Sequence, residues 1–326
     1  MLSLFAFLVA AAATNVDVRM VPDEGTAVLT ILDLRAAKQP VSEADWSRLF
    51  ATEGYVRLAK RERSMKRKFD DDAFRAFVMS DDLLARRELL RRTLDDWVHA
   101  DVRGAASLAL AYLPRNAVIR AKIYPVIKPH TNSFVFEMAT DPAIFIYVGD
   151  VPRARFETTI AHEMHHVGYD SACRTRDGGP TLEWISAFGE GLATLAAAGG
   201  PDRPAQANVE PNVQEAWQRG VASYDRNFST VEKFFLDSAH GLSDEERNRR
   251  AFEFFGLVGP WYTVGWKMAV VIEKTFGRAA LIDAFCDQRQ LLPTYNRAAA
   301  EWNRSRGETL PLWSQELLDL LARKSP

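Results

Sequence analysis

Five consecutive residues have the types and spacing of a hydrolytic metal site: His162, Glu163, Met164, His165 and His166. They form the pattern H-E-x-x-H, which supplies two metal-binding imidazoles and one carboxylate. On a helix, residues four apart differ by about 40° in azimuth, so His162 and His166 share one face and can bind one tetrahedral zinc ion. Glu163 lies beside that face, where a carboxylate can take a proton from a zinc-bound water.

A catalytic zinc ion commonly has three protein ligands, so the pattern predicts a third ligand elsewhere in the chain. Metzincins have a glycine three residues and a histidine six residues after the second motif histidine. Tyr169 and Ala172 hold these positions, which excludes that class. Glu190 is the favoured third ligand, because its helical neighbours are small and a buried carboxylate there has no nearby cation in sequence. A partly exposed surface glutamate is the ordinary interpretation, and Glu183, seven residues earlier, is the rival ligand.

Glycines flank Glu190 on both sides, and each glycine costs about 0.5–1 kcal/mol in a helix interior. This pattern indicates that another backbone approaches the helix closely. His165 points about 60° to the other side of His162, so a supporting or solvent-exposed role is expected for it rather than metal binding. The remaining histidines, His99, His130 and His240, have no motif around them.

The elements that position these residues follow from the hydrophobic pattern. Residues 16–21 alternate apolar and polar side chains, which predicts a strand, and Asp23 is expected to cap the helix that follows. Apolar residues spaced by three and four predict helices from Ser42 to about Leu113. Further strands are predicted where β-branched and aromatic residues gather, at 117–127, 133–137 and 143–148.

A helix from about Arg153 carries the motif and is expected to end after Gly168. A loop at 177–180 precedes a second helix, residues 181–198, which Thr181 caps and which carries Glu190. The chain after about residue 208 is expected to be mostly helical. Together these elements predict an α+β fold that is predominantly helical.

The composition of the 326-residue chain, with 47% hydrophobic and 26% charged residues, is typical of a globular protein. A net charge of −2 gives no electrostatic case for binding nucleic acid. The seven basic residues within 57–68 are interpreted as a solvated helix face rather than a patch for an acidic partner. Cys173 and Cys286 are the only cysteines, and one disulfide or two free thiols are equally compatible with the sequence.

Residues 1–13 form an apolar run that ends in Ala11-Ala12-Ala13, which fits a signal peptide and its cleavage site, although no basic residue precedes the run. The run is shorter than the roughly 20 residues that span a membrane, and no later segment is long and apolar enough. We therefore expect an exported protein, periplasmic or secreted, with no membrane span. The sequence does not indicate an oligomeric state.

The unit 161–166, together with Gly-Glu-Gly-Leu-Ala at 189–193, resembles the gluzincin branch of the zincin metallopeptidases. The stretch 261–269 resembles an uncharacterised bacterial family of zinc-dependent peptidases, and the likeness extends over about residues 42–296. Only the zinc motifs are specific. Gly189 departs from the Asn-Glu or Ser-Glu opening of the best-known gluzincins.

The resemblance implies a zincin-like catalytic core, in which a small mixed sheet covers an active-site helix and a ligand lies on the next helix. It implies Zn²⁺ as the cofactor, with His162, His166 and Glu190 as ligands and Glu163 as the base. The expected organisation is a signal peptide (1–13), a helical region (14–114), the catalytic core (115–200) and a C-terminal helical region (201–326).

The predicted function is zinc-dependent hydrolysis of peptide bonds in peptide or protein substrates. Tyr262, just before a helix expected at 263–275, is the candidate donor to the developing oxyanion, with His240 as a weaker alternative. Residues 144–148 are expected to be an edge strand that pairs with an extended peptide, or an ordinary sheet strand. A zinc hydrolase of a non-peptide amide and an inactive metal-binding scaffold are the alternatives. Glu163 argues against the scaffold, because a purely structural site has no use for a base.

Overall fold

The computed structural model describes residues 15–173, 183–206 and 209–322. The predicted signal peptide, the loop at 177–180 and the predicted cap Thr181 lie outside these residues. Within them the protein is mostly helical and has one four-stranded mixed sheet, which confirms a predominantly helical α+β fold. No helix in the described part of the chain has the length and apolar character needed to cross a membrane.

The sheet contains β1 (Val16–Met20), β2 (Ile119–Val126), β3 (Phe134–Phe136) and β4 (Ala143–Tyr147), in the order β1-β2-β4-β3. β2 runs parallel to both β1 and β4, whereas β3 runs antiparallel to β4. Of the two alternatives for residues 144–148, the ordinary sheet strand is therefore confirmed and the edge strand is excluded, because β4 is paired on both sides. Among the described strands, β1 and β3 form the edges of the sheet.

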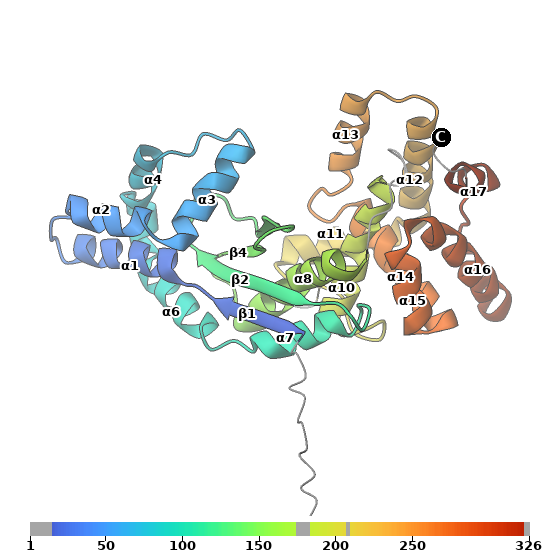
Figure 1. Ribbon diagram of the computed structural model, residues 1–326, viewed down its shortest axis with the longest axis horizontal. Helices are drawn as coiled ribbons and strands as arrows, with labels where there is room; N and C mark the ends of the chain where they lie inside the picture. The colour runs from blue at the N-terminus through green and yellow to red at the C-terminus, as the bar shows by residue number, and fades with distance from the viewer. Residues whose placement is uncertain (1–14, 174–182, 207–208, 323–326) are drawn as a thin grey trace, which may run out of the picture.

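The helices before β2 surround this sheet (Figure 1). They are α1 (Asp23–Ala36), α2 (Glu43–Phe50), α3 (Glu53–Ser64), α4 (Asp71–Val78), α5 (Asp81–Ala85), α6 (Arg87–Trp97) and α7 (Val102–Leu110). Alternate side chains of a strand face opposite sides of a sheet, so Ile123 and Ile144 pack in one core with α1, α6 and α7. On the other face, Tyr124 and Phe145 pack against Leu58 of α3.

In this region one local prediction is wrong and another fails at a single residue, both for tertiary reasons. Asp23 is the first residue of α1 but does not cap it, because its carboxylate accepts hydrogen bonds from the backbone N–H groups of Glu53 (2.7 Å) and Gly54 (3.2 Å) at the start of α3. The basic segment is not solvated throughout. The side chain of Arg57 is only 9% exposed and bonds to Glu137 and Asp141, which come from the β3–β4 connection.

The motif helix α8 (Arg153–Ala172) packs against β2 and β4 on the α7 side of the sheet. It continues past Gly168, so the predicted helix end is wrong. Gly168 is required for packing instead, since a Cβ there would lie 2.3 Å from Cδ1 of Leu113. Cys173, directly after α8, forms a disulfide bond with Cys286, with Cα atoms 4.7 Å apart.

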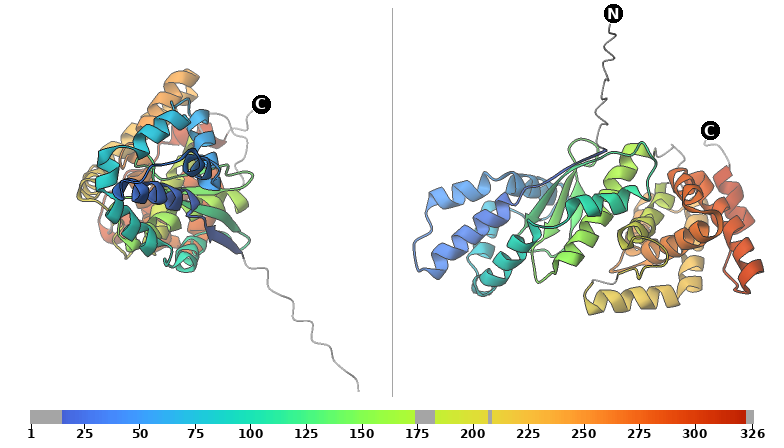
Figure 2. Two further views of the ribbon diagram at one scale, coloured as in Figure 1. Left: turned by 90° about the vertical axis from the view of Figure 1, so that its left-hand side faces the viewer. Right: turned by 90° about the horizontal axis from the view of Figure 1, so that it is seen from below.

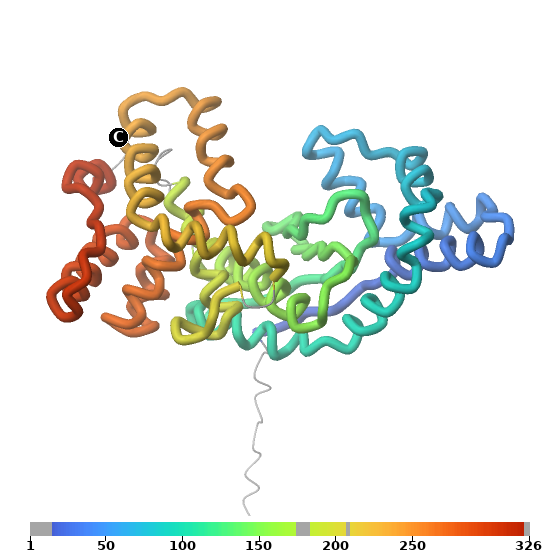
Figure 3. Tube along the Cα trace, turned by 180° about the vertical axis from the view of Figure 1, so that it is seen from behind, coloured from blue at the N-terminus to red at the C-terminus, as the bar shows by residue number. Residues whose placement is uncertain are grey.

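The second half of the chain is helical, as Figures 2 and 3 show beside the sheet-containing half. A 3₁₀ turn (Ser186–Phe188) precedes α10 (Gly189–Ala198). The helices that follow are α11 (Pro211–Ala222), α12 (Tyr224–Ala239), α13 (Asp244–Glu253), α14 (Pro260–Phe276), α15 (Arg278–Cys286), α16 (Gln288–Arg306) and α17 (Gln315–Ala322). They enclose a second hydrophobic core around Phe188, Trp261 and Trp313, while α8 and α10 lie at the boundary between the two cores.

Candidate metal centre

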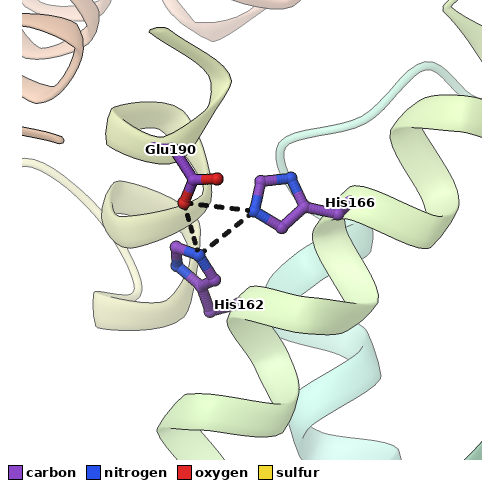
Figure 4. A group of neighbouring side chains, drawn as sticks. All are labelled: His162, His166 and Glu190. Atoms are coloured by element: carbon purple, nitrogen blue, oxygen red, sulfur yellow. Dashed lines mark hydrogen bonds and ion pairs between the residues drawn. The ribbon is translucent and has the colours of Figure 1, made fainter. Parts of the chain in front are cut away.

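Three side chains converge between α8 and α10, as Figure 4 shows. Nε2 of His162 lies 3.1 Å from Nε2 of His166 and 3.1 Å from Oε2 of Glu190, and the His166–Glu190 separation is 3.4 Å. Metal bonds of about 2.0–2.1 Å in a tetrahedral zinc site place ligand atoms about 3.3–3.4 Å apart. Two imidazoles and one carboxylate thus form a triangle of the size that one zinc ion requires.

Close contact between α10 and α14 determines how Glu190 is presented. A Cβ on Gly191 would lie 2.0 Å from the backbone N of Trp266, and a Cβ on Gly265 would lie 2.5 Å from the carbonyl oxygen of Phe188. The backbone of α14 therefore approaches α10 closely at Gly191, next to Glu190. It does not extend to Gly189, where an added Cβ would meet no atom within 4 Å.

The close contact between α10 and α14 also brings α14 to the metal group. Tyr262 lies in the first turn of α14, which begins at Pro260 rather than at the predicted residue 263, because proline is favoured at the first position of a helix. Its ring is nearly parallel to that of His162, with centroids 6.3 Å apart and an angle of 20° between planes. Burial raises the pKa of Tyr262, as do Glu190 and Glu163, so its hydroxyl stays protonated at neutral pH.

Burial also raises the pKa of Glu163, and nearby Glu190 raises it further, whereas His162 and His166 lower it. For His166, burial and the neighbouring carboxylates shift the pKa in opposite directions. Burial lowers its pKa, but the charge and hydrogen bond of Glu190, together with Glu163, outweigh burial and raise the pKa to about 9. The same pairing holds the pKa of Glu190 well below its usual range, although burial alone raises it. At neutral pH the group therefore pairs a protonated His166 with an ionised Glu190, and zinc binding has to displace the proton of His166.

The family scan agrees with this geometry. Residues 46–304 match the model of the family described as "Putative zinc dependent peptidase (DUF5700)". The chain belongs to this zinc peptidase family. Searches of curated proteins and of solved structures give no match. The predicted resemblance to a family of zinc-dependent peptidases is confirmed, and the family description together with the His-His-Glu group identifies Zn²⁺ as the cofactor.

The other residues that the sequence offered as candidates lie outside the metal group. Glu183 is exposed and stands outside the metal group. His165 is fully buried, with Nε2 3.4 Å from the carbonyl oxygen of Tyr112, and burial lowers its pKa to about 3. It is therefore a core residue and not solvent-exposed. His240 is exposed after the end of α12, with Nε2 3.5 Å from a carboxylate oxygen of Glu316, and it does not line the cleft described next.

His162 and Tyr262 line a cleft of about 1040 Å³. Its walls come from the end of β4, the first half of α8, the second half of α10, residues within 203–206 and 209–213, and the connection before α14. Besides Phe156, three polar residues of α8 that the sequence did not single out line the cleft: Arg155, Thr158 and Thr159. Their signal was present, because they stand seven, four and three positions before His162, on one helical face.

Proposed function

We propose that this protein is a gluzincin-type zinc peptidase in which His162, His166 and Glu190 hold the zinc ion. The observation that carries the proposal is the 3.1, 3.1 and 3.4 Å triangle of metal-binding atoms, of which His162 lines a large cleft. A small mixed sheet against α8, followed by a ligand on α10, supports a zincin core. Family membership supports a peptide as the substrate.

A zinc ion in this site supplies a Lewis acid, which polarises the substrate carbonyl and acidifies a water molecule. Glu163 accepts a proton from the attacking water as the water oxygen bonds to the carbonyl carbon. It then returns the proton to the leaving nitrogen as the C–N bond breaks. Burial, which raises the pKa of Glu163, brings the carboxylate nearer to the neutral range in which it can both accept and donate a proton.

Tyr262 is the proposed donor to the oxygen on which negative charge develops. Its place on the cleft wall beside His162 and the raised pKa of its hydroxyl support this role. The strand proposed to pair with the peptide is β3, at the edge of the sheet, and no longer the segment 144–148. Ser133, directly before β3, lines the cleft, so an extended substrate can pair with this strand.

Export to the periplasm or the outside remains part of the proposal. The disulfide between Cys173 and Cys286 supports it, since such bonds persist in oxidising compartments. Determining the N-terminus of the mature protein in the exported fraction tests it, and an intact residue 1 in a cytoplasmic fraction would contradict it.

The test of the proposed function is Glu163→Gln, compared with the wild type for bound zinc and for cleavage of a mixed peptide library. We expect about one zinc per chain in both proteins, and a rate of cleavage at least about 100-fold lower in the variant. Glu183→Gln is the matched control and should change neither property. Unchanged cleavage by Glu163→Gln would disprove the mechanism. A zinc-loaded wild type that cleaves no peptide would point to a non-peptide amide or to an inactive scaffold.

A further inference from the structure

One face of α8 carries more than the metal ligand into the cleft. Arg155, Thr158, Thr159 and His162 all line the cleft and are spaced as i, i+3, i+4 and i+7. The wall opposite is built from Thr194, Ala197 and Ala198, which continue the face of α10 that begins at Glu190. Beside the rings of Phe156 and Tyr262, these two helices therefore line the cleft with small side chains and hydroxyl groups, and a guanidinium group lies about two helical turns from His162.

Arg155 is a carboxylate-binding group in the structure as it stands. Its side chain is 23% exposed and forms an ion pair with Glu210, the residue that precedes α11. Glu210 is 45% exposed and lies on the wall that faces α8. The protein itself thus places the carboxylate of Glu210 against Arg155. Glu210 is the more exposed residue of this pair.

The charge of the surrounding surface favours anions. A second, shallower hollow lined by Arg67, Lys68 and His130 shares Thr131 and Asn132 with the cleft. Together the two hollows are lined by five Arg and Lys side chains but only two carboxylates, although the whole chain has a net charge of −2. Within the described residues, Arg203 and Lys68 have no carboxylate partner.

We propose that the cleft selects peptides that carry a carboxylate close to the scissile bond, and that Arg155 is the residue that recognises it by exchanging Glu210 for the substrate. This inference rests on the proposed peptidase function. The carboxylate is an Asp or Glu side chain or a free C-terminus, since either presents the same two oxygens to a guanidinium group.

The distance between Arg155 and His162 limits where that carboxylate lies. Seven residues of helix rise about 10 Å, and an extended peptide advances about 3.3 Å per residue. The recognised carboxylate therefore belongs to a residue within about three positions of the scissile bond.

The test compares peptides that differ only by Glu or Gln at each position near the cleaved bond, each with a free or an amidated C-terminus. For the wild type we expect kcat/KM to be at least about tenfold higher for the carboxylate member of one pair, because hydrogen bonds between charged groups are strong. In Arg155→Met this ratio should fall to within about twofold of unity. The pair that shows the preference identifies the source of the carboxylate.

Two further variants make the assignment specific. Glu210→Gln removes the competing carboxylate and should lower KM for the preferred acidic peptide. Arg153→Met is the matched control, because Arg153 lies on the same helix, pairs with Asp96 and does not line the cleft. This variant should show the same preference in kcat/KM for the carboxylate peptide as the wild type.

Binding of the same peptides to the Glu163→Gln protein separates failure of this inference from failure of the proposed function. If the acidic and amide peptides bind equally, and cleavage shows no preference, Arg155 does not select the substrate while the peptidase function stands. If acidic peptides bind at least tenfold more tightly in an Arg155-dependent manner but the wild type cleaves none, the recognition is correct and the peptidase assignment is wrong.

Discussion

Two clusters of polar side chains in this protein differ in how their atoms are arranged. Around Arg57, donors alternate with acceptors: its guanidinium donates to Glu137 (2.7 Å), Asp141 (2.9 Å) and the hydroxyl of Tyr124 (3.0 Å). Around His162, by contrast, two imidazole nitrogens and a carboxylate oxygen meet at one point. The first cluster satisfies its own charges and holds α3 to the sheet. The second gathers atoms that bind metal and opens onto a cleft.

The difference shows that burial and charge alone do not identify a functional site. Both clusters contain buried ionisable groups and a tyrosine with a raised pKa: burial raises the pKa of Tyr124, as it does that of Tyr262. What separates them is the identity of the converging atoms and the cleft that His162 of the second cluster lines. Matched substitutions should therefore impair zinc binding or catalysis in the cluster around His162, and stability in the cluster around Arg57.

The largest effect is expected from removing the carboxylates. Glu190→Ala should weaken zinc binding by more than about 100-fold, because even the outer partners of metal ligands contribute 10- to 100-fold. Glu137→Ala should leave zinc affinity unchanged. Titration against a competing chelator measures both. Metal content near one per chain in Glu190→Ala would show that the third ligand is another residue.

The two tyrosines give the second contrast. Tyr262→Phe should lower kcat by about 100-fold with zinc content unchanged, since a donor to a developing oxyanion contributes about that factor. Tyr124→Phe should leave kcat unchanged and lower stability, because Glu53 and Arg57 each lose a hydrogen bond. Kinetics and urea denaturation of both variants test this pairing. Equal kinetic effects would remove Tyr262 from the proposed mechanism.

Arg57→Met tests the structural cluster directly. We expect a loss of about 2–3 kcal/mol in the free energy of unfolding, because Glu137 is left without its buried partner while the exposed Asp141 is screened by solvent. Chemical denaturation measures the loss, and zinc content should not change. A stability equal to that of the wild type would show that the cluster contributes nothing to the fold.

The smallest effect is a pH dependence confined to the metal group. Zinc binds neutral imidazole, and the pKa of His166 is raised to about 9, so zinc must displace a proton at any lower pH. Zinc affinity should therefore rise by up to about tenfold per pH unit between pH 7 and 9 and level off above this range. Calorimetry in buffers of different ionisation enthalpy measures the released proton. A flat profile would contradict the raised pKa.

The sequence predicted what depends on local geometry and missed what depends on distant partners. The spacing of His162 and His166 places both on one face of any helix, and the small neighbours of Glu190 pointed to its place in the group. Arg57 was misinterpreted because its carboxylate partners lie 80 and 84 residues away in the chain. The sequence left an edge strand and an ordinary strand open at 144–148 for the same reason, since the pairing of β4 with β3 and β2 is not encoded within these residues.

The position of the metal group between the two hydrophobic cores has a consequence for unfolding. α8 packs Phe156, Ile160 and Met164 into the core that contains the sheet, whereas α10 contributes Leu192 and Leu195 to the C-terminal core. A zinc ion bound by both helices thus cross-links the two hydrophobic cores. At a thousandfold excess over its dissociation constant, such a ligand adds about 4 kcal/mol to the folded state. Thermal unfolding should accordingly be a single transition with zinc and two separable transitions after chelation.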